Sequence, residues 1–215
     1  MRNFIQPEWP APPQIKAYTS LRSGWSDLSF PEEPIWVQQT HSTIVIEATP
    51  ENKEKKADAT FTPQANRVCV VVTADCLPVL ICNQQATHVA AIHAGWRGLA
   101  NGIIETTLQA IQQPAEDLLV WLGPAIGPQK FEVGQDVYEA FTLKHAESAT
   151  AFVPHTEGKW LADLYELARI RLKQQGVSRI YGGNFCTYTQ EDLFFSYRRD
   201  KGNTGRLASF IWRTP

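Results

Sequence analysis

The chain has 215 residues, of which 43% are hydrophobic and 20% are charged, and its formal net charge is −2. This length suits one domain and buries enough surface to fold without a disulfide or a metal ion. No basic run or basic-aromatic stripe is present, which argues against a nucleic-acid partner.

The N-terminal sequence MRNFIQPEWPAPPQ has no apolar core of a secretory signal peptide, and no apolar run in the chain reaches the length of a membrane span. We therefore expect a cytoplasmic protein without a membrane partner, either a monomer or a homodimer, whose four cysteines are reduced thiols. The dense prolines between positions 7 and 13 predict an extended N-terminal arm.

The first half of the chain predicts mainly strands. The segment IWVQQTHSTIVIEA alternates and is rich in strand-forming residues, so we expect strand on both sides of residues 39–42. Apolar residues over 67–74 and 87–93 predict two further strands, and VVVTADCLPVLIC at 70–82 reads as the middle strand of a buried sheet. In LANGIIETTLQAIQQ, apolar residues recur at helical spacing until Pro114 ends the helix.

The second half mixes helices with short strands. LLVWL at 118–122 predicts a strand, Gly134 precedes a helix, and a stronger helix over about 160–175 ends at Gly176. The remainder reads as short, hairpin-like strands in SRIYGG, FCTYT, LFFSYRR and LASFIWR. We therefore favour an α+β (mixed α/β) fold, with mixed β-sheets flanked by helices in a single domain, over a doubly wound sheet.

An acid and a thiol interrupt the most apolar segment of the chain. Asp75 and Cys76 stand where a core strand would carry Val or Ile, and Pro78 removes a hydrogen-bond donor two residues later. A cysteine in an apolar strand is usually inert, which is our interpretation of Cys69 and Cys82. A buried Asp75 without a partner would be costly, so we interpret Asp75 and Cys76 as functional.

Two histidines share the setting of Cys76 at the end of a β element. His41 lies in QTH, and His93 lies in HAGWRG before a glycine-flanked turn. Two imidazoles and one thiolate could bind Zn²⁺ and leave the fourth ligand position open for water or substrate. The same residues could instead act without a metal, with Cys76 as nucleophile and a histidine as its base. In that case Asp75 would orient a histidine or bind a substrate hydroxyl, so the catalytic candidates are Cys76, His93 and Asp75.

Three further residues are candidates for binding substrate. Arg97 lies in HAGWRG, where its guanidinium and the free N–H groups of a helix start suit phosphate or carboxylate. Arg199 lies in the arginine-rich segment SYRRDKGNTGRLASF, which reads equally well as a solvated hairpin, and Gln39 begins the QTH motif. We expect Gln39, Arg97 and Arg199 to contact the substrate.

Six motifs follow one another along the chain: QTH at 39–41, ADAT at 57–60, TADCLPVLI at 73–81, HAGWRGLANGII at 93–104, GPAIGPQKFEVG at 123–134 and FFSYRRDKGNTGR at 194–206. Together they resemble the YfiH family, also called the laccase-domain or multicopper polyphenol oxidase family, whose members are described as purine nucleoside phosphorylases. The resemblance implies one catalytic domain over 1–215. It also implies a metal site, usually zinc, from the His of QTH, the Cys of ADC and the His of HAGWRG, which are His41, Cys76 and His93.

The resemblance also implies several activities. These are phosphorolysis of adenosine, inosine and 5′-methylthioadenosine with inorganic phosphate, and deamination of adenosine as a side activity. Two alternatives stay open: a Cys/His hydrolase that edits the peptidoglycan precursor UDP-MurNAc-L-Ser, and a weak polyphenol oxidase that uses Cu²⁺ at the zinc site. A true multicopper oxidase needs clustered His-x-His ligands, whereas this chain has five histidines and no His-x-His.

One segment departs from the family pattern. In SLRSGWSDLSFPEEPIWVQQTH the chain passes almost directly from Arg22 to His41, so the segment at about 20–35 is shortened. A substrate contact that this segment supplies in other members is therefore not assured here, and the substrate preference stays open. The shortening is also the one feature that favours a metal-binding protein without activity.

Overall fold

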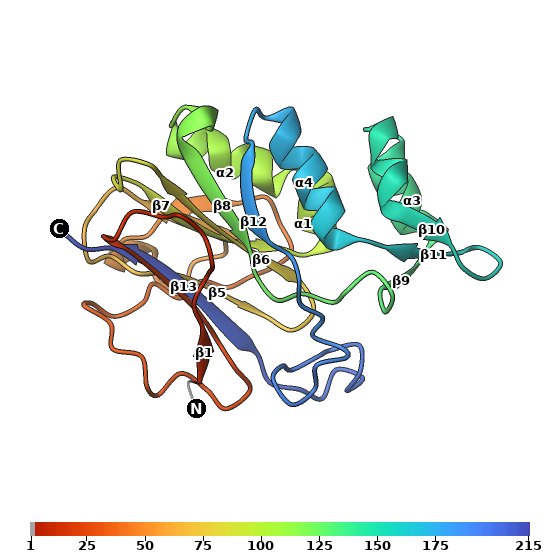
Figure 1. Cartoon of the computed structure of the whole chain (residues 1–215), viewed down its shortest axis with the longest axis horizontal. Coiled ribbons are helices and arrows are strands. Elements are labelled where there is room, and N and C mark those ends of the chain that lie inside the picture. The colour runs from red at the N-terminus through yellow and green to blue at the C-terminus, as the bar shows by residue number, and fades with distance from the viewer. Residues whose placement is uncertain (1–2) are drawn as a thin grey trace.

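The computed structural model describes residues 3–215, so Met1 and Arg2 of the predicted domain lie outside the described residues. Within that range the strands form three sheets, accompanied by four α-helices (Figure 1). This arrangement confirms the predicted class of mixed β-sheets flanked by helices in a single domain. No helix among residues 3–215 is long and apolar enough to cross a membrane.

The central sheet has six strands in the order β12-β8-β6-β7-β4-β3. Their bounds are Arg179–Gly182 (β12), Leu118–Leu122 (β8), Leu77–Asn83 (β6), Val89–Ala94 (β7), Ala59–Thr62 (β4) and Val45–Glu47 (β3). Strand β6 is buried along its whole length, because helices cover one face of the sheet and a second sheet covers the other. Val79 and Ile81 pack on the helical side, whereas Leu80 and Cys82 pack toward the second sheet. Two-sided burial therefore explains the continuous apolar run of β6.

Three helices cover one face of the central sheet (Figure 1). They are α1 (Trp96–Asn101), α2 (Ile103–Ile111) and α4 (Leu164–Gln174). The single helix predicted through LANGIIETTLQAIQQ is wrong, because Gly102, with φ of 101°, ends α1 and begins α2. The helix predicted over about 160–175 begins at Leu164, where the Asp163 side chain accepts hydrogen bonds from the N–H groups of Tyr165 and Glu166.

The second sheet has four antiparallel strands in the order β1-β2-β13-β5. Their bounds are Phe4–Ile5 (β1), Ile15–Ser20 (β2), Leu207–Arg213 (β13) and Cys69–Thr73 (β5). The segment that follows β2, which includes the predicted shortened stretch, contributes Phe30 and Trp36 to a cluster on this sheet. The Phe30 and Phe210 rings lie 4.6 Å apart, and Trp36 meets Phe210 edge-on at 5.9 Å. The stretch therefore packs as a cover on strand β13.

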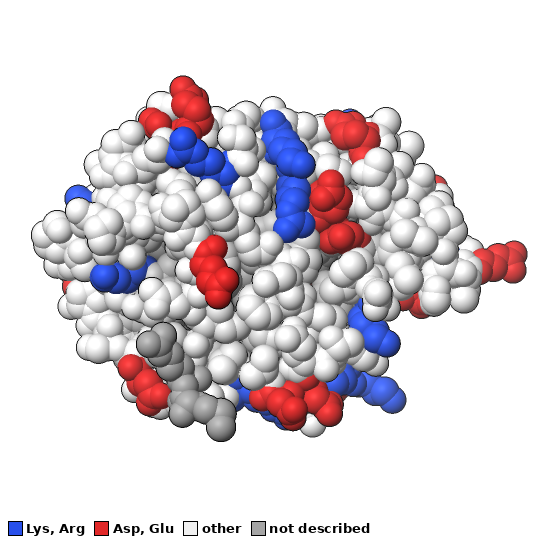
Figure 2. Space-filling model, viewed as in Figure 1, with Lys and Arg blue, Asp and Glu red and all other residues white. Residues whose placement is uncertain are grey.

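A smaller unit lies at one side of the molecule (Figure 1, right). It contains β9 (Glu132–Gly134), β10 (Phe152–Pro154) and β11 (Lys159–Ala162), in the order β10-β11-β9, with α3 (Gln135–Thr142). Short 3₁₀ helices occur at Pro50–Asn52 (η1), Ala115–Asp117 (η2) and Ala146–Ala151 (η3). On the face shown in Figure 2, basic and acidic side chains are interspersed.

Several strand predictions are wrong. Of the strand expected on both sides of residues 39–42, only β3 forms, because residues 35–38 make isolated bridges. The segment 70–82 is not one strand, because the chain bends at residues 74–76 and continues in another sheet, so β5 and β6 belong to different layers. Asp75 lies in this bend with φ of 85°, a value that strand backbone does not adopt. Of the four short C-terminal strands, those predicted in SRIYGG and LASFIWR are confirmed as β12 and β13. The strands predicted in FCTYT and LFFSYRR are wrong, because these segments form turns, and β12 pairs in parallel with β8 rather than in a hairpin.

Candidate metal centre and substrate cavity

The structure brings His41, Cys76 and His93 together at one end of the central sheet. One ligand atom from each lies within 4.8 Å of the others. The Cys76 Sγ atom is 3.8 Å from His41 Nε2, and the two imidazole centres are 4.7 Å apart with their planes at 75°. Zn–S and Zn–N bonds of ~2.3 and ~2.05 Å in a tetrahedral site separate sulfur from nitrogen by about 3.6 Å. The Cys76–His41 distance therefore matches this geometry, and His93 lies close enough to share the same ion.

Strand pairing explains how Cys76 and His93 meet. In the antiparallel β6–β7 pair, Leu77 faces Ala94 and Pro78 faces His93. Cys76 directly precedes β6, and His93 lies near the end of β7, so the thiol and the imidazole lie at the same end of the pair. The bend between β5 and β6 thus presents Cys76 to the histidines.

Asp58 fixes both histidines. From the sequence it was noted only as part of the ADAT motif. The residue is fully buried, and its carboxylate accepts a hydrogen bond from His93 Nδ1 at 2.8 Å. It also accepts the backbone N–H groups of Thr40, His41 and Ser42 at 3.1, 2.9 and 2.7 Å, and the Ser42 hydroxyl at 2.6 Å. His41 has φ of 60°, and these bonds hold its loop in that uncommon conformation.

The electrostatics of the metal-free site favour a thiolate beside a protonated imidazole. Burial raises the pKa of Cys76, but the hydrogen bonds and charges of His41 and His93 outweigh it and lower the pKa to about 6. Burial lowers the pKa of His93, but its bonds to Asp58 and Cys76 raise it to about 9. Burial also raises the pKa of Asp58, yet hydrogen bonds from His93 and Ser42 hold it well below its ordinary value. Asp58 therefore remains ionised at neutral pH.

The surroundings of the three side chains also fit a metal ion. Because Asp58 binds Nδ1 of His93, the Nε2 atom is left for a metal, which is the usual arrangement of a ligating histidine. A Cβ atom on Gly95 would lie 2.7 Å from His41 Cδ2 and 3.2 Å from Cys76 Sγ. The φ of Gly95 is −63°, which any residue adopts, so glycine is required here for space. One thiolate and two imidazoles are donors that suit zinc.

The three residues line a cavity of about 520 Å³, a size typical of small-molecule sites. Its apolar lining includes Trp96, Ile126, Phe131 and Leu164. Its cationic lining consists of Arg97, Arg198 and Arg206. The cavity therefore combines a surface for a flat apolar ring with groups that attract an anion.

Arg97, which was predicted to contact the substrate, lies in the lining of the cavity. Its guanidinium is 4.4 Å from the centre of the Trp96 ring, and no carboxylate of residues 3–215 forms an ion pair with it. Helix α1 has six residues, so an anion there would depend on the Arg97 side chain rather than on the helix start. Arg198 and Arg206 were not predicted as substrate contacts, although they lie in the same arginine-rich segment as Arg199.

Gln39 and Asp75 line the cavity, but their polar atoms are engaged with the protein. The Gln39 amide exchanges two hydrogen bonds of 2.7 Å with the backbone of Val72. The Asp75 carboxylate accepts hydrogen bonds from Thr187 Oγ1 at 2.6 Å, Ser196 Oγ at 3.0 Å and the Arg198 N–H at 2.7 Å. These bonds give both residues a structural role: Gln39 ties the QTH loop to β5, and Asp75 anchors the C-terminal loop. Their substrate-contact and catalytic roles stay predictions.

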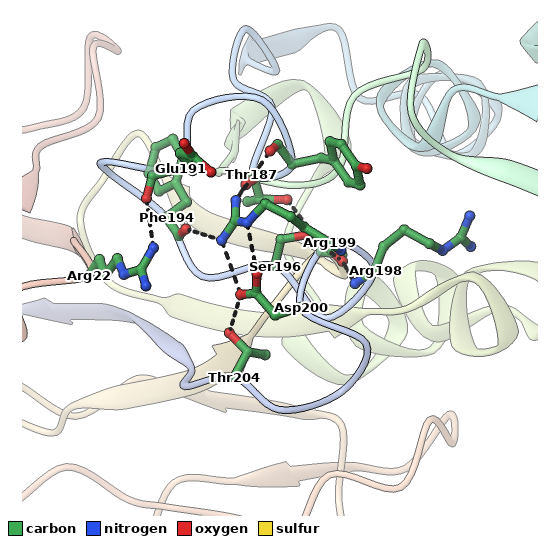
Figure 3. A network of polar contacts seen from close by, with 11 residues as sticks. Arg22, Thr187, Glu191, Phe194, Ser196, Arg198, Arg199, Asp200 and Thr204 are labelled. Atoms are coloured by element: carbon green, nitrogen blue, oxygen red, sulfur yellow. Dashed lines mark hydrogen bonds and ion pairs between the residues drawn. The ribbon is translucent and has the colours of Figure 1, made fainter.

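Arg199 does not line the cavity, contrary to its predicted role. Figure 3 shows its guanidinium at the centre of a polar network, from which the Arg198 side chain points away. All five N–H groups of Arg199 are used: two bind Asp200, and three bind the carbonyl oxygens of Thr187, Tyr188 and Phe194. A guanidinium with no free donor cannot bind a substrate anion, so Arg199 holds the loop that carries Arg198 and Arg206.

The chain is similar to known proteins over nearly its whole length. Residues 19–214 match the family described as multi-copper polyphenol oxidoreductase laccase. The purine nucleoside phosphorylase YfiH of Escherichia coli (strain K12) is 44% identical over 243 residues, covering 99% of each chain. Because this alignment is longer than 215 residues, that relative has residues with no counterpart here. Their location at the shortened segment 20–35 stays a prediction.

Two solved structures share the fold. The crystal structure of a Neisseria meningitidis protein covers 100% of both chains with a TM-score of 0.93 and 42% identity. The crystal structure of YlmD from Geobacillus stearothermophilus has a TM-score of 0.90 and 25% identity, covering 100% of this chain and 97% of YlmD. The similarity extends over the whole length, so it includes every element that forms the cavity.

Proposed function

Because the chain belongs to the family of multi-copper polyphenol oxidoreductase laccases, we propose that it is a zinc-dependent purine nucleoside phosphorylase. The name of the 44% identical relative supports this proposal. The observation that carries it is the cavity itself, where His41, Cys76 and His93 share one space with an apolar lining and three arginines. The proposed substrates are adenosine, inosine and 5′-methylthioadenosine, each with inorganic phosphate.

Phosphorolysis exchanges one bond at the sugar. A phosphate oxygen forms a bond to C1′ while the C1′–N9 bond breaks, the electron pair stays on the purine, and the purine gains a proton. The apolar lining, such as Phe131 and Trp96, suits the purine ring, and the arginines suit the phosphate.

His41, Cys76 and His93 would hold the zinc ion. When bound, zinc supplies a positive charge that stabilises developing negative charge on a nucleophile or leaving group. Asp58 keeps the His93 ring oriented, and Gly95 leaves the space that the ligands require. Cu²⁺ at the same residues would account for weak phenol oxidation. Residues 3–215 contain one group of three candidate ligands, which suits a single ion rather than a multicopper cluster.

Two finer points accompany the proposal. Deamination of adenosine is a side activity that the same site would support, because it also requires a polarised nucleophile next to a purine. A cytoplasmic location is supported by the four cysteines, all of which are free thiols in the structure. The monomeric or homodimeric state stays a prediction.

A Cys/His hydrolase acting on a peptidoglycan precursor is the second candidate. The observation in its favour is the close pair of Cys76 and His41, at 3.8 Å, together with the lowered pKa of Cys76. In that reaction the thiolate would attack an amide carbonyl, the amine would leave with a proton as the C–N bond breaks, and water would hydrolyse the thioester, so no phosphate would be needed. The two candidates therefore differ in a measurable requirement.

The test is release of the purine base by zinc-loaded protein with and without phosphate. We expect adenine from 5′-methylthioadenosine, and hypoxanthine from inosine, to appear when phosphate is supplied. Equal release without phosphate would contradict phosphorolysis and indicate hydrolysis. Turnover of UDP-MurNAc-L-Ser in parallel tests the second candidate, and inosine formed from adenosine tests deamination. The Cys76→Ala variant serves as the inactive control.

A further inference from the structure

One buried hydroxyl at the cavity has no partner in the protein. Thr73 is the last residue of β5 and is only 2% exposed, and its side chain lines the cavity. Within the described residues its Oγ1 atom has no hydrogen-bond partner. Buried hydroxyl groups normally have one, because an unpaired polar group lowers stability. Thr73 therefore has a free hydrogen-bonding group at a place where a ligand is expected.

An arginine that comes directly before the paired strand lines the same cavity as Thr73. Thr73 is paired with Leu207, the first residue of β13, and Arg206 immediately precedes it. One nitrogen of Arg206, Nη1, donates to the carbonyl oxygens of Thr204 and Gly205, and the guanidinium lies 6.0 Å from the centre of the Tyr197 ring. The other guanidinium nitrogens, Nε and Nη2, have no partner among residues 3–215. Arg206 thus keeps donors for a ligand in the same cavity as Thr73.

The charge balance of the cavity favours an anion at this position. Of the described residues that line the cavity, Asp75 is the one carboxylate, and both of its oxygens already accept hydrogen bonds. Three arginines face no competing acid there. Phosphate is a tetrahedral oxyanion whose oxygens accept hydrogen bonds, so a neutral O–H donor and a guanidinium together match it.

We propose that Thr73 and Arg206 form the subsite that binds the inorganic phosphate co-substrate. The inference rests on the proposed phosphorylase function and assigns the position of one reactant. Thr73 donates its O–H to a phosphate oxygen and stays neutral, while Arg206 pairs with the anion. Another phosphate oxygen forms the bond to C1′ as the C1′–N9 bond breaks, and the purine leaves with the electron pair and takes up a proton.

The test compares three variants of the zinc-loaded enzyme. Thr73→Val replaces the hydroxyl with a methyl group of similar size, and Arg206→Gln removes the charge. Ser148→Ala is the matched control, because Ser148 is also fully buried with an unpartnered hydroxyl but does not line the cavity. We expect Thr73→Val and Arg206→Gln to raise the KM for phosphate at least about tenfold, as for loss of a hydrogen bond to a charged group. The KM for the nucleoside and the zinc content should not change.

Stability separates a binding role from a structural one. Without phosphate, Thr73→Val and Ser148→Ala should have a Tm equal to or above that of the wild type, because each removes an unpaired buried hydroxyl. Phosphate should raise the Tm of the wild type and of Ser148→Ala, because a ligand that binds the folded protein stabilises it. It should not raise the Tm of Thr73→Val, because this variant lacks the hydroxyl that binds the anion. A lower Tm of phosphate-free Thr73→Val, or an unchanged phosphate KM in both cavity variants, would overturn the proposal.

A phosphate group could also arrive attached to a nucleotide. Adenosine 5′-monophosphate is the comparison ligand: a Tm shift lost in Thr73→Val for this nucleotide but retained for inorganic phosphate contradicts the assignment. The phosphate-induced Tm shift does not depend on turnover. If the wild type shows this shift but its base release does not need phosphate, the proposed function fails while the anion subsite stands.

Discussion

Replacement of Asp58 by asparagine tests whether one buried carboxylate organises the metal centre. In the wild type, Oδ1 accepts hydrogen bonds from His93 Nδ1 and the His41 N–H, and Oδ2 accepts them from the Thr40 and Ser42 N–H groups and the Ser42 hydroxyl. Asparagine has one accepting oxygen, and its NH₂ group cannot accept. At least two of these bonds are therefore lost in Asp58→Asn, whichever way the amide turns.

The magnitude follows from those two bonds. A hydrogen bond to a charged group contributes about 1.5–3 kcal/mol, so the free energy of unfolding should fall by about 3–6 kcal/mol. Zinc affinity should fall about 10–100-fold, because His93 loses the charged acceptor that fixes its ring. The pKa of Asp58 is below its ordinary value of 3.8, so its contribution is complete above pH 3.8 and is lost as the pH falls below it. The free energy of unfolding of Asp58→Asn should therefore lack this loss at low pH.

The assay is urea unfolding of the metal-free protein at neutral pH, together with zinc titration against a competing chelator. Asp136→Asn is the matched control, because Asp136 is exposed and its side chain accepts no hydrogen bond from residues 3–215; its unfolding free energy should stay within about 0.5 kcal/mol. If Asp58→Asn unfolds within about 1 kcal/mol of the wild type and binds zinc equally well, the carboxylate does not organise the site, and the reasoning is refuted.

Four further outcomes are expected. Cys76→Ala should lose zinc and activity together, and full zinc occupancy by metal analysis would contradict its assignment as a ligand. Gly95→Ala should fold normally but bind zinc at least about tenfold more weakly in the chelator titration, because its Cβ would press on His41. The raised pKa of His93 stabilises the metal-free protein fully below pH 6.5, and this contribution is lost as the pH rises through about 9. Zinc needs the neutral ring, so its affinity should increase up to about pH 9, with proton release measurable by calorimetry in different buffers. Arg199→Lys should lower the Tm and raise substrate KM values with unchanged zinc content, because lysine cannot form five directed bonds; zinc loss would contradict a role confined to the loop.

The positions of the three candidate ligands were accessible from sequence because each interrupts a regular pattern. Cys76 and Asp75 break an apolar run, and His93 ends another just before glycine. A polar residue at the end of a buried strand has few structural reasons to be there, so these positions stand out without knowledge of the fold. His41 was grouped with them on the same ground, as a polar residue in an otherwise apolar strand segment, and the family resemblance then implied the same three residues.

The predicted boundaries and contacts failed where local pattern gives no information. Nothing in VVVTADCLPVLIC says that its two halves enter different sheets, because both halves are equally apolar and the bend depends on Asp75 adopting a positive φ. Likewise, FCTYT and LFFSYRR are rich in strand-forming residues, but their polar groups pair with Arg199 and Asp75 instead of a neighbouring strand.

The sequence by itself determined the fold class and the identity of the donor groups, because hydrophobic periodicity and residue chemistry are local properties. Only the tertiary structure decided which polar groups are free and which are occupied. The Asp75 carboxylate is engaged by residues 112 to 123 positions away, and all five N–H groups of Arg199 are engaged around its own loop. In contrast, the Thr73 hydroxyl and the Nε and Nη2 groups of Arg206 have no partner among residues 3–215. Asp58 shows the same dependence, since its partners His93 and Ser42 are separated from it by 35 and 16 positions. Whether a polar side chain is free to bind substrate or supports the fold is set by the partners that folding brings to it.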